Sequence, residues 1–383
     1  MDRETLLQHL GEEQKPYGAV TPPITQTSLF VFNRFDDFVN RTEDGPGEPY
    51  VYSRVTNPTN EIAEAKLAML EGTGACRLFN SGMAAISASV MSAVATGSHV
   101  VCIDTAYGPL QQFLRDYMPK FGVTTTFVPG ISTEEILDAI RPETSLIYLE
   151  SPSSILFRMQ DFSAISAHCK AKGITTITDN SYSGTIFQQP AQFGVDLIVH
   201  SATKYIVGHS DVVAGVSVGS KERIREMVLS EVPLLGAALA PFPAWLLLRG
   251  LRTLPMRMRQ AQESGNAMAI WLKTQHWVER VYHVGSSDYE YKCLRDKQMT
   301  GSSSLLSFEP KDQSVEWSRR FVEAQRIFQL GVSWGGFESL CVPLQMHPGD
   351  WSAPRRLLRV YCGFENVGDL QADLAQAAAV ASS

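Results

Sequence analysis

The chain has 383 residues, with a hydrophobic fraction of 44% and a charged fraction of 19%, which predicts two domains that fold without disulfides or a metal. Lys and Arg number 33 and Asp and Glu 40, so the net charge is −7, and the absence of basic clusters argues against binding to nucleic acid or to an anionic membrane. The six cysteines form no CxxC pair, which is typical of scattered reduced thiols in a cytoplasmic protein.

Residues 1–60 are predicted to form an arm rather than a domain. The opening segment, MDRETLLQHLGEEQK, is too polar for a signal peptide. Adjacent prolines and a short apolar run follow in GAVTPPITQTSLFVF, and GPGEP at 45–49 breaks regular structure. An arm this apolar is expected to pack on another surface, such as a second subunit.

Residues 61–245 alternate between segments with helical spacing and short apolar or β-branched runs. The strand-like runs are SHVVCID (98–104), SLIYLES (145–151), GITTITD (173–179) and DLIVHS (196–201). The helical segments include NEIAEAKLAMLEG (60–72), LQQFLRDYMPKFG (110–122) and DFSAISAHCKAKG (161–173). This rhythm predicts a mostly parallel sheet covered by helices. Ligands of such sheets gather at the carboxyl ends of the strands, so the polar residues after these runs are the candidates for a site.

Residues 246–383 are predicted to form a smaller C-terminal domain, entered through a long helical pattern at 244–275. The longest apolar stretch, 234–248, contains Pro241 and Pro243 and is too short to span a bilayer. SSLLSFEP (303–310) and RRLLRVYCGFE (355–365) are predicted strands, and DLQADLAQAAAVA (369–381) a closing helix.

Two residues at the ends of neighbouring predicted strands suggest the chemistry. Asp179 follows GITTIT, and Lys204 follows the next strand in HSATKYIVGHSD, one strand–helix–strand step later. Both are therefore expected on one rim of the sheet. They suit a pyridine cofactor, because the carboxylate keeps the ring nitrogen protonated and the lysine forms an imine with the aldehyde. The alternative is an unrelated surface aspartate and surface lysine.

A phosphate site is predicted close to this lysine. The hydroxyls of Ser201 and Thr203 could donate hydrogen bonds to an anion. FNSGMAAISASVMSA is typical of a loop entering a helix, which would place the N–H groups of Gly82 and Met83 at the helix N-terminus, where anions are favoured. An ordinary helix start capped by Ser81 explains the segment equally well.

Two further side chains fit the same interpretation. Tyr107, after the run SHVVCI, could stack on a flat ring. Arg359, in the strand-like LLRVYCGF, could hold a carboxylate through two parallel hydrogen bonds. The ordinary alternatives are a half-buried tyrosine at the rim and an exposed strand arginine.

Two other patterns do not support a site. Gly72-Thr-Gly74 has no third glycine and follows a helix, so it is no dinucleotide fingerprint. His200, His209 and Asp211 match no zinc signature, and polar residues that support a cofactor loop explain them better.

Taken together, these motifs resemble those of the Cys/Met-metabolism enzymes that depend on pyridoxal 5′-phosphate (PLP), the group of cystathionine γ-synthase, cystathionine β- and γ-lyases and methionine γ-lyase. SATKYIVGHSDVVAG is the most specific match, and NSGMAAI, LESP, TDN, RGLRTL and SWGGFESL occur in the expected order from YVYSRVTNPTN to the closing helix. The resemblance implies the fold type I of PLP-dependent transferases, with a mostly parallel seven-stranded sheet, helices on both faces and a smaller C-terminal α/β domain. It also implies a homotetramer of two tight dimers with active sites at the subunit interface.

The resemblance also assigns roles to individual residues. Lys204 falls on the lysine that binds the cofactor and Asp179 on the partner of the pyridine nitrogen. Tyr107 falls on the stacking tyrosine, and it shares the catalytic role with Lys204. The positions that fall on phosphate ligands are Gly82, Met83, Ser201 and Thr203 and, from the neighbouring subunit, Tyr52 and Arg54. The positions near the substrate are Arg359 and Ser333, which match groups that hold its carboxylate, with Trp334 and Val332 in the same loop.

Different motifs favour different members of the family. SWGGFESL and LESPSS resemble cystathionine β-lyase, and Ser154 stands where many relatives have an asparagine beside the phenolic oxygen of the cofactor. YSRVTNPT resembles the γ-enzymes instead. Val332 offers no polar group to the distal end of cystathionine, and Pro109 stands where methionine γ-lyase has a reactive cysteine.

The leading hypothesis is therefore a PLP-dependent carbon–sulfur lyase that performs β-elimination on cystathionine-like amino acids and releases pyruvate, ammonia and a thiol. The alternative within the family is γ-elimination from an S- or O-substituted homoserine such as methionine or canavanine, or γ-replacement of the cystathionine γ-synthase type. The alternative from another class is a non-catalytic protein with the PLP fold. A NAD-dependent enzyme is disfavoured because its phosphate fingerprint is absent.

Overall fold

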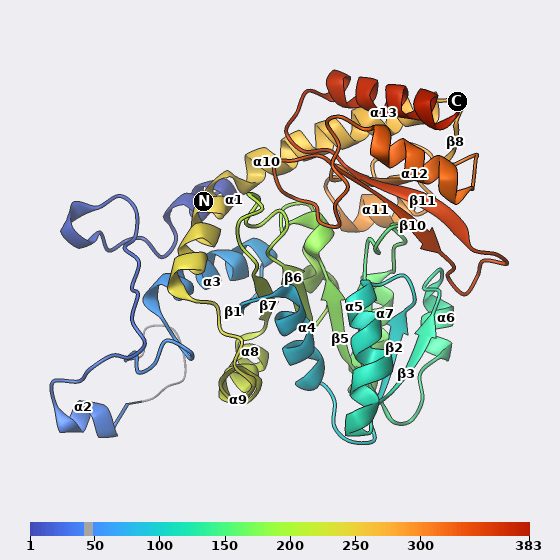
Figure 1. The fold of residues 1–383 in the computed structure, drawn as a ribbon. Coiled ribbons are helices and arrows are strands. Elements are labelled where there is room, and N and C mark those ends of the chain that lie inside the picture. The colour runs from blue at the N-terminus through green and yellow to red at the C-terminus, as the bar shows by residue number, and fades with distance from the viewer. Residues whose placement is uncertain (42–48) are drawn as a thin grey trace.

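The computed structural model describes residues 1–41 and 49–383, which build two sheets joined by one long helix, α10 (Pro241–Lys273) (Figure 1). Of the breaker predicted at 45–49, only Pro49 lies among the described residues. Along these two ranges, no helix has both the length and the apolar character that crossing a membrane would need.

The large sheet carries the predicted strand rhythm. Its strands, in order across the sheet, are β1 (Ala75–Phe79), β7 (Gly215–Gly219), β6 (Leu197–Ser201), β5 (Thr175–Asp179), β4 (Thr144–Glu150), β2 (His99–Ile103) and β3 (Thr124–Val128). The pairs among β6, β5, β4, β2 and β3 are parallel, and β7 is antiparallel to both of its neighbours. The prediction of a mostly parallel seven-stranded sheet is confirmed.

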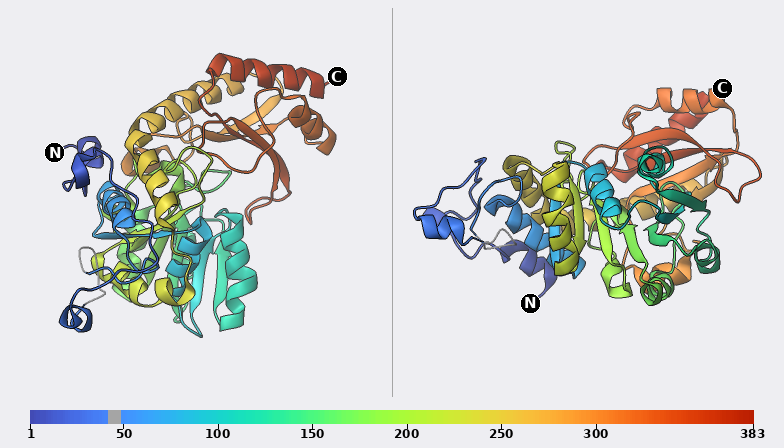
Figure 2. Two further views of the ribbon diagram at one scale, coloured as in Figure 1. Left: turned by 60° about the vertical axis from the view of Figure 1, so that its left-hand side comes forward. Right: turned by 90° about the horizontal axis from the view of Figure 1, so that it is seen from below.

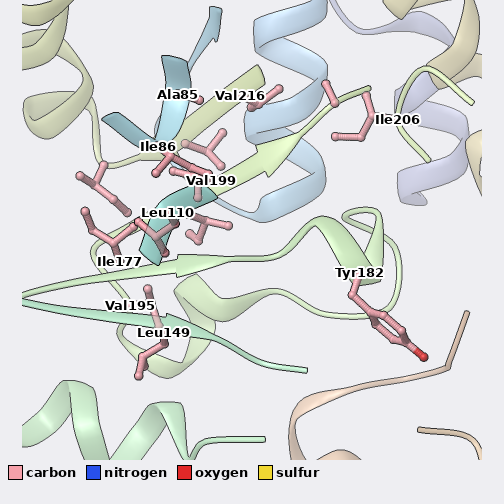
Figure 3. Packing of buried hydrophobic residues seen from close by; sticks show 14 of the residues in the cluster. Ala85, Ile86, Leu110, Leu149, Ile177, Tyr182, Val195, Val199, Ile206 and Val216 are labelled. Carbon is pink, nitrogen blue, oxygen red and sulfur yellow. The ribbon is translucent and has the colours of Figure 1, made fainter. Parts of the chain in front are cut away.

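Helices cover both faces of this sheet, as Figures 1 and 2 show. They are α3 (Pro58–Glu71), α4 (Gly82–Met91), α5 (Gly108–Gln112), α6 (Thr133–Asp138), α7 (Phe162–Lys172), α8 (Lys221–Leu229) and α9 (Glu231–Leu235). Burial on both faces explains why β5, with the sequence TTITD, is buried along its whole length. In Figure 3, Ile177, Val199 and Val216 of the strands pack beside Ala85 and Ile86 of α4.

The end signals read from the sequence explain where several helices begin and end. Asn57 caps α3 by accepting a hydrogen bond from the N–H of Thr59, and Gly72 ends the helix in the left-handed conformation. The prediction of one continuous helix at 110–122 is wrong. α5 passes into a π-helical turn (Phe113–Tyr117) and then a 3₁₀ turn (Met118–Phe121), because Pro119 has no N–H to continue the α-helical pattern.

The second sheet lies at the C-terminal end of α10 and is antiparallel throughout. In order across the sheet, its strands are β10 (Leu340–Met346), β11 (Arg355–Tyr361), β9 (Leu305–Pro310) and β8 (Val278–Tyr282), and its helices are α11 (Lys292–Gln298), α12 (Val315–Ala324) and α13 (Val367–Ala381). The strands predicted at 303–310 and 355–365 are β9 and β11, and the predicted closing helix is α13. A separate apolar cluster fills this part of the molecule.

The N-terminal arm is anchored to the body near its start and attached again around residues 22–25, where Trp245 donates to the carbonyl of Pro22, and parts of the arm extend outward (Figure 2). It contains α1 (Arg3–His9), a 3₁₀ turn (Pro16–Gly18) and α2 (Phe35–Val39). The anchor is the buried Lys66 of α3, which donates to the carbonyl of Leu7 at 2.6 Å and pairs with Glu12 at 3.0 Å. Beyond the anchor, apolar side chains such as Val31 (84% exposed) and Phe35 (78% exposed) face outward.

Candidate active site

Asp179 and Lys204 meet at the carboxyl rim of the large sheet, as the sequence predicts. Asp179 is the last residue of β5, and Lys204 lies in the turn after β6, the neighbouring parallel strand. Both line a cavity of about 710 Å³. An α-helix was expected between the two strands, and that prediction is wrong. The described connection contains only two short 3₁₀ turns, Ser181–Ser183 and Pro190–Phe193.

The side chain of Lys204 reaches across to the C-terminal part of the chain. Its Nζ donates a hydrogen bond to Ser333 Oγ at 2.8 Å and lies 5.5 Å from the centre of the Trp334 ring. Burial, together with the positive charge of Arg359, lowers the pKa of the Lys204 amine to about 8. About a tenth of this amine is therefore uncharged, and nucleophilic, at pH 7, far more than for an ordinary lysine.

The residues predicted to bind a phosphate lie on the next part of the rim. Gly82 and Met83 form the first turn of α4, and they line the cavity together with Ser201 and Thr203. A Cβ atom at Gly82 would lie 3.0 Å from the side chain of Ser201, so the backbone approaches closely there. The Ser81 hydroxyl caps α4 at the N–H of Ala84. Ser81 is therefore an ordinary helix cap, and the first turn of the same helix also lines the cavity.

Glu150 is a site residue to which the sequence reasoning gave no role. It ends β4, is paired in register with Asp179, and is 8% exposed. Its carboxyl accepts hydrogen bonds from the N–H of Tyr107 at 2.7 Å and from Ser154 Oγ at 2.6 Å. Burial and the charge of Asp179 raise the pKa of Glu150 to about 8. The rule that polar residues at strand ends mark the site would have identified Glu150, because it follows the predicted run SLIYL.

The residues expected near the substrate carboxylate also converge on the cavity. Arg359 of β11 donates to the carbonyl oxygens of Val332 and Ser333, which fixes the loop that carries the partner of Lys204. Burial lowers the pKa of the Arg359 guanidinium. Val332 is 80% exposed and, like Trp334, lines the same cavity.

Tyr107 and Ser154 lie at the cavity as expected, and Tyr52 and Arg54, which are predicted to serve the neighbouring subunit, lie outside the cavity of their own chain. The ring of Tyr107 is 42% exposed at the cavity wall, and burial of the rest raises the pKa of its hydroxyl. Tyr52 and Arg54 are exposed on the arm, with the guanidinium 5.1 Å from the centre of the tyrosine ring, and neither lines the cavity of its own chain.

The histidines near Lys204 have structural partners. His200 Nε2 lies 2.7 Å from Glu71 Oε1, with both side chains fully buried, and His209 Nδ1 lies 2.7 Å from the carbonyl of Val207. Asn180 donates to the same Glu71 oxygen at 3.0 Å, directly behind Asp179.

This set of donors and acceptors fits a phosphorylated pyridine aldehyde. Asp179 is 7% exposed, and burial raises its pKa, so its carboxylate needs a cationic partner such as a protonated ring nitrogen. A lysine amine with a lowered pKa, the first turn of α4 and the aromatic side chain of Tyr107 lie around the same cavity. The fold and the site thus define an α/β enzyme of the PLP-dependent class.

Comparison with known proteins identifies the family. A family model described as Cys/Met metabolism PLP-dependent enzyme matches residues 4–379. An L-methionine gamma-lyase of Porphyromonas gingivalis is 36% identical over 96% of this chain and 94% of its own length. A chloroplastic cystathionine beta-lyase of Arabidopsis thaliana is 34% identical over 97% of this chain and 79% of its own length. A cystathionine gamma-lyase of Bacillus subtilis is 34% identical over 98% and 99%.

The chain belongs to the Cys/Met-metabolism family of PLP-dependent enzymes. The predicted fold class, the predicted cofactor and, at the level of the family, the predicted carbon–sulfur lyase are thereby confirmed.

Proposed function

We propose that the chain performs β-elimination on S-substituted cysteines, the class to which cystathionine belongs, and releases pyruvate, ammonia and a thiol. The observation that carries the proposal is the convergence of Lys204, Asp179 and Arg359 on one cavity from three separate elements. Ser154, bound to Glu150, lies in LESPSS, which together with SWGGFESL at 333–340 resembles the β-lyases, and a relative named cystathionine beta-lyase supports that choice.

The proposed roles follow from the positions of the side chains. Lys204 would hold the cofactor covalently, Asp179 would face its ring nitrogen and Tyr107 its ring. Its phosphate would lie among four residues: Gly82, Met83, Ser201 and Thr203. The bound cofactor supplies an electron sink that stabilises negative charge at the α-carbon of the substrate.

The residues of the chain then guide one proton. Arg359 binds the substrate carboxylate and orients the α C–H bond toward Lys204. Once released from the cofactor, the Lys204 amine removes the α-proton at Nζ, because a pKa near 8 leaves it partly uncharged at neutral pH. Ser333 Oγ, 2.8 Å away, holds that nitrogen in place. The β-carbon–sulfur bond breaks with its electron pair on sulfur, and the departing sulfur takes up a proton.

Two experiments test this proposal. Borohydride reduction of the purified protein followed by peptide mass spectrometry should locate the cofactor on Lys204, and an adduct elsewhere would overturn the assignment. Keto acid analysis with β-substituted substrates should yield pyruvate. A Lys204→Ala variant should lose at least about 10³-fold in activity, since both the covalent link and the proton carrier are removed.

A second candidate is γ-elimination, which the Porphyromonas and Bacillus relatives favour by name. Exposed Val332 in the cavity gives no polar contact that selects either reaction. Product analysis separates the two, because γ-elimination from an S-substituted homocysteine such as methionine yields 2-oxobutyrate rather than pyruvate.

We also propose that the active enzyme is a homotetramer of two tight dimers. Tyr52 and Arg54 lie exposed on an arm on which several apolar side chains, among them Val20, Val31 and Phe35, are also exposed in the isolated chain. In a dimer, these two residues would complete the phosphate site of the neighbouring subunit. All six cysteines are unpaired, which supports a cytoplasmic location.

A further inference from the structure

One strand of the small sheet presents a row of apolar side chains to the active-site cavity. Along β10, Val342, Leu344 and Met346 recur at every second residue, so they share one face of the strand. All three line the cavity and are partly exposed. Gln345, between the last two, is exposed and absent from the lining.

The register of the sheet places this row beside the proposed carboxylate-binding residue. Val342 pairs with Arg359 across the antiparallel β10–β11 ladder, so the two side chains lie on the same face. From there, each step to Leu344 and Met346 advances about 7 Å along the strand. A substrate held by Arg359 therefore has an apolar wall of about 14 Å along which its side chain can extend.

The charged groups of the cavity are concentrated at the other end. Among its described lining residues, the Asp, Glu, Lys and Arg side chains are Glu150, Asp179, Lys204 and Arg359. Glu150 and Asp179 are register neighbours, Lys204 is bound to Ser333, and Arg359 holds the loop beside it. Val332, whose carbonyl accepts from Arg359, adds a further apolar side chain to the lining.

These positions set the chemistry that can occupy the far end. Arg355, the register partner of Met346, lies at the far end of the same face, but it is outside the lining, pairs with Glu309 at 3.4 Å and lies over the Trp351 ring. The distal ammonium and carboxylate of cystathionine would therefore lose water there without gaining an ionic partner from the lining, which is costly. An alkyl or benzyl group would instead bury apolar surface, with a gain of about three- to fourfold in binding for each methylene.

We propose that β10 forms the leaving-group subsite and selects cysteines that carry an apolar group on sulfur, such as S-alkyl and S-benzyl cysteines. This inference rests on the proposed β-elimination and names its substrate class. One water is consumed: the α C–H and Cβ–S bonds break, sulfur leaves as the protonated thiol, and the remaining three-carbon fragment is hydrolysed to pyruvate and ammonia. No oxidant or reductant is needed.

The first test compares leaving groups on the purified holoenzyme by measuring pyruvate release. S-propylcysteine and cystathionine form a matched pair, because they differ only in the distal amino and carboxyl groups. We expect kcat/KM to rise about three- to fourfold per methylene from S-methyl- to S-propylcysteine. We also expect S-propylcysteine to exceed cystathionine by at least about tenfold, given the unpaired charges that cystathionine would bury. Cystathionine equal to or better than S-propylcysteine would overturn the inference.

The second test uses two variants that add the same charge to opposite faces of β10. Met346→Glu places a carboxylate on the cavity wall, whereas Gln345→Glu places it on the exposed side one residue away. Met346→Glu should lower kcat/KM for S-propylcysteine about tenfold or more while changing that for S-methylcysteine less than about threefold. Gln345→Glu should leave both substrates unchanged. Equal losses for the two substrates in Met346→Glu would contradict a leaving-group subsite.

A third substrate separates failure of this inference from failure of the proposed function. β-Chloroalanine carries a good leaving group that does not reach β10. Pyruvate from β-chloroalanine together with no dependence on alkyl length would remove the apolar subsite and leave β-elimination intact. No pyruvate from any β-substituted substrate, with 2-oxobutyrate from methionine, would remove the proposed function. A rise in activity from methionine to its S-propyl homologue would then still support the apolar wall.

Discussion

At the scale of single residues, the site depends on how burial changes the proton affinity of two groups. Lys204 and Glu150 lie on opposite sides of Asp179, and the pKa of each moves toward neutrality, downward for the amine and upward for the carboxyl. Burial disfavours the charged form in both cases. Lys204 can thus be deprotonated and Glu150 protonated at the same neutral pH.

The lowered pKa of Lys204 makes its reactivity in the cofactor-free enzyme predictable. With a pKa of about 8, roughly one fifth of the amine is uncharged at pH 7.4, against about 0.1% for an ordinary lysine. Labelling by an amine-reactive reagent should therefore rise with pH through a midpoint near 8 at Lys204. Peptide mass spectrometry measures this curve, and exposed Lys172 in the same digest gives the comparison. Coincident curves for the two lysines would contradict the expectation.

The raised pKa of Glu150 predicts how stability changes with pH. The folded chain keeps a proton on Glu150 that the unfolded chain releases above about pH 4.3, so this residue's contribution to stability falls as pH rises toward 8. The Glu150→Gln variant has no titratable group at this position, so it lacks this pH-dependent loss of stability. In urea unfolding of the cofactor-free protein, the variant should gain about 1 kcal/mol or more relative to the wild type between pH 5 and pH 8. Glu134→Gln, at an exposed position, should show a constant difference.

The sequence could predict Asp179 and Lys204 because each directly follows a buried strand. Glu150 satisfies the same rule, because it is the last residue of the buried strand β4. Val342, Leu344 and Met346 could not be assigned, because an apolar strand residue reads as core until its neighbours are known. The Ser333–Lys204 contact joins residues 129 positions apart, and no local pattern encodes such a separation.

At the scale of elements, helices with explicit end signals were predictable and those without them were not. α3 and α7 both end at a glycine in the left-handed conformation, and the predicted segments end at these same residues. The segment at 110–122 has a helical pattern of apolar residues, but Pro119 divides it. β8 and β10 were not predicted, because their partly exposed, mixed sequences lack the apolar runs that reveal β2, β4, β5 and β6. In the large sheet, β1, β3 and β7 were not predicted individually either.

The loop before β10 owes its position to one glycine. Gly335 has φ +90, and a Cβ there would lie 2.7 Å from the backbone at Lys204 and Tyr205. Gly335→Ala should therefore lower the free energy of unfolding by about 3 kcal/mol, from left-handed strain plus the clash. Gly97→Ala is a matched control, because φ is +92 but nothing lies within 4 Å, so only about 1 kcal/mol of strain is expected. Urea unfolding measures both, and equal losses would show that the close approach is unimportant.

At the scale of the whole molecule, the cavity exists because two sheets from different parts of the chain face each other. The large sheet supplies Asp179 and Lys204, and the β10–β11 hairpin supplies Arg359 and the apolar wall. Arg158 of the large part pairs with Asp350 of the hairpin loop at 2.8 Å and holds the two parts together beside the cavity. The boundary that we propose between 245 and 246 falls inside α10, so this helix connects the two parts rigidly.

Arg54 lies outside the cavity of its own subunit, so a mixture of two variants can show whether it serves the neighbouring subunit. If Arg54 serves the neighbouring site, Arg54→Ala and Lys204→Ala subunits are each inactive as homodimers. A hybrid dimer then contains one site with an intact Lys204 from one subunit and an intact Arg54 from the other, and a second site that lacks both.

Random mixing makes half of the dimers hybrids, each with one intact site of two, so refolding an equimolar mixture should restore about one quarter of the wild-type activity. This fraction follows from subunit statistics for inactive homodimers, and any residual activity of the Arg54→Ala homodimer adds one quarter of its own value to the total. Pyruvate release after joint denaturation and refolding measures it, and each variant refolded alone gives the baseline. Activity that stays at the baseline in the mixture would place Arg54 in the site of its own subunit, because no hybrid could then contain a complete site.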